Sequence, residues 1–335
     1  MDRRTFMLVA VGGLGTTSQI AQLQPSEKSG AIVVGILGNE PPSLSSTHFG
    51  VAASNTLAGE IETVTRAAAY ASRLRVVNVT GTDVESLSAQ ARLLLGQKAA
   101  VIVAVGTPAT IAAAKATKGL PIVMVGVADP VALGLVRSLA RPGGDITGIS
   151  LLGPEILEKS LDLVREAAPS IRRPAVLWNP SNPGAALSLR HMQLVAAAKG
   201  LYFVSVPVEQ AAQLDRALTN LTQLQHDALM LINDPVFLTK GDRILAYCSE
   251  RRLPTMFSTA AWVISGGLMA YEPQAIHMYR RAAAYVARIL GGAKPMDLPV
   301  EQPTTFSFVL NMKTANALGL TIPSSLLLRA DQVIE

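Results

Sequence analysis

Unbroken apolar runs of strand length recur along the chain, and stretches of helical length separate them. Residues 100–105 and 122–127 are two such runs, and the alanine-rich residues 109–118 lie between them. Gly106-Thr107-Pro108 ends the first run and Ala128-Asp129-Pro130 ends the second. Apolar runs bounded by turn residues are typical of strands buried on both faces of a parallel sheet. The pattern therefore predicts a strand–helix–strand unit with a right-handed connection.

The same alternation continues on both sides of this unit. Further strands are predicted over residues 31–37, 75–79, 146–150, 174–178, 202–206, 228–232 and 305–310. Helices are predicted over residues 52–72, from a cap at Asp83, and over 134–139, 154–167, 185–199, 211–223, 274–290 and 311–318. Strands alternating with helices predict an α/β fold with parallel sheets flanked by helices. The 335 residues suffice for two lobes of about 150 residues each.

Composition favours a packed globular protein over a disordered one. Hydrophobic residues make up 49% of the chain and charged residues 16%, and aromatic residues only 4%, so the core is aliphatic. The net charge of +5 is spread over the chain in no more than pairs, such as Arg172-Arg173 and Arg280-Arg281, so no nucleic-acid partner is expected. The single cysteine, Cys248, is predicted to be a buried structural thiol.

The first 24 residues predict an export signal. Arg3-Arg4-Thr5-Phe6 precedes a short apolar run over residues 7–11, and small residues follow it. Two arginines and a phenylalanine are typical of twin-arginine export, and the Sec route stays open. No cysteine follows the run, so no lipid anchor is expected, and the run is too short to span a membrane. Cleavage is expected near Ala21, and an ordinary cytoplasmic N-terminus is the alternative.

Signals of catalysis are absent from the sequence pattern. The four histidines, at positions 48, 191, 226 and 277, have no metal-ligand spacing. No glycine-rich phosphate loop follows a predicted strand, and residues 148–153 contain one residue too many for a nucleophile elbow. We therefore expect no catalytic residue, no metal and no cofactor, and a protein that is not an enzyme.

Several motifs resemble a known family in their order and spacing. These motifs are Asp129-Pro130-Val131 with Gly134-Leu135-Val136, the RPGGDITG stretch over 141–148, VLWNPSNP over 176–183, LPVEQPT over 298–304 and NALGLTIP over 316–323. Together they resemble ABC-transporter substrate-binding proteins, in the subfamily that includes the TrpX-like aromatic amino-acid binders. The resemblance covers nearly all of residues 100–335.

The resemblance implies a type I periplasmic binding protein fold, in which two Rossmann-like lobes close on a ligand. Three crossings between the lobes are then expected near residues 147–150, 267–271 and 302–305. The first lobe would comprise residues 31–148 with 271–303, and the second residues 149–270 with 304–335.

Candidate ligand-binding residues follow the predicted strands, because ligands of such sheets lie beyond the carboxyl ends of the strands. Backbone N–H groups at helix starts attract a carboxylate, an aspartate can accept a ligand ammonium, and asparagine amides can hydrogen-bond a ligand. The candidates are Asn39, Ser43, Ser45, Thr107, Asp129, Asn179, Asn182, Asp234 and Glu272. For each of them, turn formation or helix capping is the alternative. Trp262 and Tyr271 could stack on a ligand, although packing in the core or hinge is favoured.

These observations predict a periplasmic solute-binding protein of an ABC importer. It would capture a small organic ligand between its lobes and deliver it to an inner-membrane permease with its ATPase. The low aromatic content argues against a sugar and fits an amino acid or a small carboxylate. A periplasmic sensor with the same fold, acting on a membrane kinase, is the alternative, followed by an exported α/β enzyme. A LacI-like repressor is not expected, because an export signal stands where a DNA-binding head would be.

Overall fold

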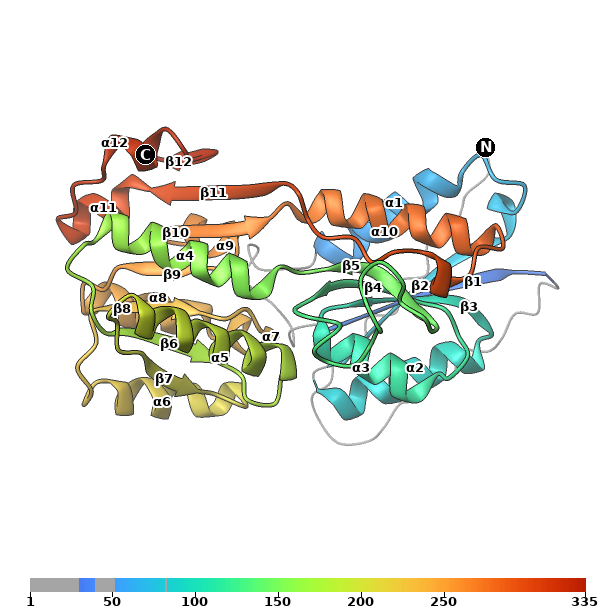
Figure 1. The fold of residues 1–335 in the computed structure, drawn as a ribbon, viewed down its shortest axis with the longest axis horizontal. Helices are drawn as coiled ribbons and strands as arrows, with labels where there is room; N and C mark the ends of the chain where they lie inside the picture. The colour runs from blue at the N-terminus through green and yellow to red at the C-terminus, as the bar shows by residue number, and fades with distance from the viewer. Residues whose placement is uncertain (1–29, 40–51, 82) are drawn as a thin grey trace.

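The computed structural model describes residues 30–39, 52–81 and 83–335, which form two β-sheets with helices on both faces (Figure 1). The first sheet has five parallel strands in the order β2-β1-β3-β4-β5. These strands are β1 (Ile32–Asn39), β2 (Leu74–Gly81), β3 (Ala99–Val105), β4 (Ile122–Val127) and β5 (Ile146–Ser150).

Two pairs of helices cover this sheet. One face packs against α1 (Ala52–Thr65) and α10 (Ala275–Leu290), and the other against α2 (Val84–Gly96) and α3 (Thr107–Ala116). We call this sheet with its four helices the first lobe. The apolar side chains of β3 and β4 contribute to the cores on both faces, as the unbroken apolar runs predict.

The second sheet has seven strands in the order β12-β11-β10-β9-β8-β6-β7, and its described pairs are parallel except β10 with β11. Its strands are β6 (Pro174–Trp178), β7 (Val204–Pro207), β8 (Ala228–Leu231), β9 (Thr255–Phe257), β10 (Met269–Pro273), β11 (Phe306–Asn311) and β12 (Gln332–Ile334). The predicted α/β class, with parallel sheets flanked by helices, is confirmed.

Helices cover both faces of the second sheet as well. One core contains side chains of α4 (Gly153–Ala167), α5 (Pro183–Ala198), α11 (Met312–Leu318) and α12 (Ser324–Leu327). The other contains side chains of α6 (Leu214–Leu221), α7 (Pro235–Leu238), α8 (Gly241–Glu250) and α9 (Ala260–Ile264). This sheet with its helices is the second lobe.

Local signals in the sequence explain several boundaries. Asp83 caps α2, as predicted, because its Oδ1 accepts a hydrogen bond from the Ser86 N–H at 2.8 Å. Gly148 in β5 has a φ of +129°, and a Cβ at this position would lie 2.2 Å from the Met124 carbonyl oxygen. Only glycine fits there, so β5 can pair closely with β4.

Three crossings connect the lobes within the described residues: 151–152 between β5 and α4, Gln274 between β10 and α10, and 302–305 before β11. The first two lie a few residues later than the sequence suggested. β5 stays in the first sheet through Ser150, and β10 stays in the second through Pro273, because their ladder pairing continues that far.

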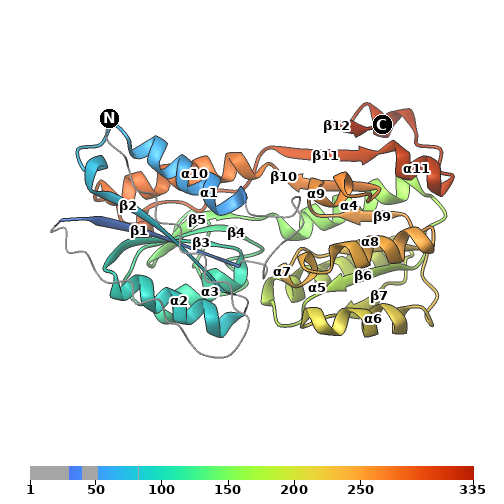
Figure 2. The same cartoon turned by 180° about the vertical axis from the view of Figure 1, so that it is seen from behind.

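Backbone hydrogen bonds tie these crossings to one another. The Glu301 N–H donates to the Gly148 carbonyl and the Ser150 N–H donates to the Glu301 carbonyl, both at 2.9 Å. The Gln274 N–H donates to the Thr305 carbonyl at 3.0 Å. Figure 2 shows from behind that β10 and β11 lie side by side, with β10 running toward the first lobe and β11 away from it. The crossings therefore form one hydrogen-bonded group.

One predicted element is wrong. Residues 134–139 form no helix but a series of turns and bends. Gly134 has a φ of +68°, and the Arg137 N–H donates to the Pro142 carbonyl at 3.0 Å, so the segment folds back toward the Pro-Gly-Gly sequence that follows. In the described part of the chain, no helix is both long and apolar enough to cross a membrane.

Candidate functional site

The loops after the strands of one lobe lie against those of the other. Thr107, which follows β3, and Ala128, which follows β4, contact the first turns of the second-lobe helices α4 and α5. Figure 1 shows the two sheets beside each other with these segments between them. The carboxyl ends of the central strands of both sheets therefore border the same region, where α/β sheets bind their ligands.

The lobe contact at this point is close enough to require glycine. A Cβ on Gly184, in the first turn of α5, would lie 2.7 Å from Thr107 Oγ1 and 3.1 Å from Ala128 Cβ. A Cβ on Gly153 would lie 3.4 Å from Ala128 Cβ, in ordinary contact. The lobes thus touch across Thr107, Ala128, Gly153 and Gly184, which we call the lobe contact.

Thr107 is one of the predicted residues that the structure places between the lobes. It is 4% exposed, and its Oγ1 accepts a hydrogen bond from the Ala128 N–H at 3.2 Å. This bond joins the loops that follow β3 and β4. The Thr107 hydroxyl, at the N-terminus of α3, therefore holds the two first-lobe loops together at the lobe contact.

Three predicted residues of the second lobe come together around a buried carboxylate. Asp234 is 4% exposed, and its Oδ1 accepts hydrogen bonds from Asn179 Nδ2 at 3.0 Å and from the Val236 N–H at 3.1 Å. Its Oδ2 accepts from Asn182 Nδ2 at 2.9 Å. Asn182 also caps α5, because its Oδ1 accepts from the Gly184 N–H at 3.0 Å. The network locks the loops after β6 and β8 together.

The other predicted residues of the first lobe are less fully described. Asp129 forms a turn, because its Oδ1 accepts hydrogen bonds from the N–H groups of Val131 and Ala132 at 3.1 and 2.9 Å. Asn39 ends β1 at the same edge of the sheet, and its side chain is not among the described ones. Ser43 and Ser45 lie outside the described residues.

Glu272 lies at the carboxyl end of β10, beside the second crossing. Its Oε1 accepts a hydrogen bond from the Ala260 N–H at 2.9 Å, at the start of α9. Burial raises the pKa of the Glu272 carboxyl, and the bond from Ala260 acts in the opposite direction. Burial also raises the pKa of Tyr279 on α10, and the charge of Glu272 adds to that shift. Glu272 thus stands close to a first-lobe helix.

The two aromatic candidates stack on other aromatic rings, and the cysteine is buried. Trp262 is fully buried and stacks on Phe257 with ring centroids 4.8 Å apart. Tyr271 stacks on Phe306 across β10 and β11, at 5.4 Å. Cys248 is buried, as predicted, and burial raises the pKa of its thiol to about 12, which keeps it protonated and unreactive.

Sequence reasoning missed two hydroxyl groups near the carboxyl edge of the second sheet. Ser258 follows β9, and Thr239 follows α7 in the loop after β8. Both hydroxyl oxygens are buried, and neither has a hydrogen-bond partner among the described residues. The only sequence signal is a polar residue directly after an apolar run, which is too common to identify a site.

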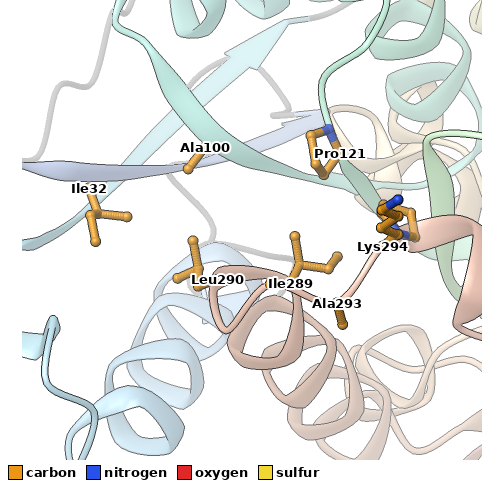
Figure 3. Close-up of a pocket in the computed structure, with 9 residues that line it drawn as sticks. Ile32, Ala100, Pro121, Ile289, Leu290, Ala293 and Lys294 are labelled. Carbon is orange, nitrogen blue, oxygen red and sulfur yellow. The ribbon is translucent and has the colours of Figure 1, made fainter.

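The described residues provide no metal site. No three His, Cys, Asp or Glu side chains of the described ranges are placed to hold a metal ion. An apolar hollow of about 380 Å³ lies at the amino ends of β1, β3 and β4 (Figure 3). Its lining includes Ile32, Ala100, Pro121, Ile289, Leu290 and Lys294. None of the predicted site residues within the described ranges lines this hollow.

Comparisons with known proteins agree with this fold. Residues 68–334 match the family described as ABC transporter substrate binding protein. A tyrosine-binding protein of Clostridioides difficile is 26% identical over 238 residues, which cover 71% of this chain and 68% of that protein. The structure of the ABC domain in complex with L-Trp from Streptococcus pneumonia has a TM-score of 0.81 at 24% identity, covering 91% of this chain and 100% of the other. The structure of a conserved domain protein from Vibrio cholerae also has a TM-score of 0.81, at 25% identity, with 91% and 99% covered.

Proposed function

The chain belongs to the ABC transporter substrate-binding protein family, and from this premise we propose that it captures an amino acid between its two lobes and delivers it to an inner-membrane permease with its ATPase. Family membership confirms the predicted general role, the binding of a small molecule for an ABC transporter, and the prediction that the chain is not an enzyme. The choice of an amino acid is supported by the relatives, one named for tyrosine binding and one solved in complex with L-Trp.

The lobe contact is the observation on which the proposal depends most. It brings the starts of α3 and α5 to the same region from opposite lobes. Asn182 already accepts from the first N–H groups of α5, whereas α3 has no side-chain cap, so the start of α3 is the one that favours a carboxylate. A ligand held by both lobes favours the closed arrangement by its differential affinity for it. An amino acid supplies that carboxylate together with an ammonium group for an acidic side chain.

A thermal-shift screen of the purified full chain tests the ligand class. The panel contains the twenty amino acids and a set of small carboxylates without an amino group. A ligand at 100 times its dissociation constant adds about 2.7 kcal/mol to the free energy of unfolding, so a binder stands out from the rest. We expect stabilisation by one or a few amino acids, confirmed by calorimetry. Stabilisation by simple carboxylates alone, or by none of the panel, would contradict an amino acid as ligand.

We also propose that the mature protein is periplasmic and lacks a lipid anchor. The twin-arginine type of signal over residues 1–24 supports this location. Fractionation followed by N-terminal sequencing should find a periplasmic protein that begins near residues 22–25. Recovery of intact Met1 from the cytoplasm would refute the location.

Uptake measurements separate transport from sensing. Deleting the gene should abolish high-affinity uptake of the radiolabelled amino acid that the screen identifies. Unchanged uptake, together with a lost transcriptional response to that amino acid, would point to the periplasmic sensor instead.

A further inference from the structure

We infer that Glu272 receives the ammonium group of the ligand, an inference that rests on the proposed amino-acid function and deepens it. Its side chain is a half-buried carboxylate at the end of β10, and one of its oxygens has no hydrogen-bond partner in the part of the chain that the structure describes.

The position of Glu272 follows from the strand directions. β10 is parallel to β9, so its carboxyl end lies at the same edge of the second sheet as the ends of β6, β8 and β9. Glu272 is the next-to-last residue of β10, just before the crossing at Gln274. Tyr279 on α10 lies close enough to be influenced by its charge. Glu272 therefore faces groups of both lobes, as a ligand contact in a closing protein must.

The hydrogen bonds of the three candidate acids distinguish them. Both oxygens of Asp234 are occupied, by two asparagine amides and a backbone N–H. Asp129 accepts hydrogen bonds from two N–H groups of its own turn, both on Oδ1, and both bonds are exposed to solvent. Glu272 accepts one bond, on Oε1, and no ion pair within 4.0 Å involves it among the described residues. Its Oε2 is thus available to a cation.

Burial makes cation binding favourable for the Glu272 carboxylate. Withdrawing a charged carboxylate from water without a counter-charge is unfavourable, which is why its pKa is raised. An ammonium group that hydrogen-bonds to Oε2 supplies the missing charge, and such charge-assisted bonds are short and strong. The ligand-free protein therefore holds an uncompensated charge that an amino acid neutralises.

A purely structural role would be the capping of α9 through the Ala260 N–H. Glutamine keeps an Oε1 acceptor for that bond and removes only the charge, so Glu272→Gln separates the two roles. Glu166→Gln is the matched control, because Glu166 lies on α4 and pairs with Arg329 and Ser325 near the C-terminus, away from the lobe contact.

The experiment is calorimetry of the full chain with paired probes. L-tyrosine is compared with 3-(4-hydroxyphenyl)propanoate, and L-tryptophan with indole-3-propanoate; each second compound lacks only the amino group. We expect Glu272→Gln to weaken the better-binding amino acid by about 30-fold or more, the usual effect of removing one partner of a buried charge pair. Affinity for the matching deamino compound should stay within about 3-fold, and the melting temperature of the ligand-free variant should be equal to or above that of the wild type. Glu166→Gln should leave both affinities unchanged.

The outcomes are distinct. If Glu272→Gln binds the amino acid as tightly as the wild type, or loses the same factor for both members of a pair, Glu272 is no ammonium receptor and the inference is wrong. If the wild type binds neither these nor any other amino acid, the proposed function fails and the inference fails with it.

Discussion

Replacing Gly184 by alanine should weaken ligand binding without weakening the fold. Gly184 lies in the first turn of α5, in a helical conformation that alanine also adopts. The added methyl group would lie 2.7 Å from Thr107 Oγ1, 3.1 Å from Ala128 Cβ and 3.2 Å from Thr107 Cβ. The first distance is shorter than a methyl carbon tolerates. Since these neighbours belong to the other lobe, a small rotation of the lobes apart removes the clash.

The added methyl group has two effects, one on ligand affinity and one on the free energy of unfolding. Overpacking by one methyl group costs about 1–3 kcal/mol, and here the cost falls only on the closed arrangement. A ligand that requires closure then binds about 5- to 150-fold more weakly. Alanine in place of glycine within a helix adds roughly 0.5–1 kcal/mol to the free energy of unfolding. We therefore expect Gly184→Ala to melt no lower than the wild type in the absence of ligand, while its affinity falls.

Calorimetry with the amino acid found in the screen measures the affinity, and small-angle scattering measures the radius of gyration with and without it. Gly59→Ala is the matched control, because Gly59 also lies in a helix and a Cβ there meets nothing within 4 Å. It should stabilise the protein and leave the affinity unchanged. If Gly184→Ala binds as tightly as the wild type and contracts as much on binding, the lobe contact is not part of the ligand-bound arrangement.

Three further predictions concern the framework of the site. Asp234→Asn should lower the free energy of unfolding by about 1–3 kcal/mol in urea titrations. The new amide N–H₂ group would face one of the N–H donors from which Asp234 now accepts a hydrogen bond. Equal stability would show that the network is dispensable. The hydrogen bonds from Arg281 lower the pKa of Glu301 below its ordinary value of 4.5, so this carboxylate stabilises the fold at neutral pH and ceases to do so as the pH falls through its folded pKa. The stability difference between wild type and Glu301→Gln should accordingly shrink between pH 6 and pH 3, and a constant difference would refute the assignment. Cys248 should react with a thiol reagent at pH 8 at least about 100-fold faster in denaturant than in the native protein, since its thiol is buried with a pKa of about 12; equal rates would mean that the site is open.

The strands were predictable because both faces of each central strand are buried. An apolar run such as residues 100–105 has no polar face to present to water, so its length alone indicates the element, and β3 extends it by one residue to Ala99–Val105. Residues 134–139 have apolar side chains at helical spacing, Leu135, Val136 and Leu139. There the positive φ of Gly134 and local hydrogen bonds to the Pro130 and Pro142 carbonyls override this pattern, and neither is visible in the hydrophobic positions.

The candidate site was predictable in position but not in its internal contacts. Asn179, Asn182 and Asp234 follow β6 and β8, which are neighbours in the sheet, so the topology brings them together. That they hydrogen-bond to one another depends on loop conformation, which their spacing does not encode. Ser258 likewise follows a strand, and the burial of its hydroxyl is visible only in the structure.

The hydrogen bonds that tie the three crossings together reduce the freedom of the whole molecule. Separate linkers would let the lobes slide, twist and tilt independently. With Glu301 bonded to Gly148 and Ser150, and Thr305 bonded to Gln274, any displacement of one linker displaces the others. Such coupling favours a hinge rotation of the lobes over independent movements of the linkers. Two fluorophores, one per lobe, should therefore report the same transition wherever they are attached.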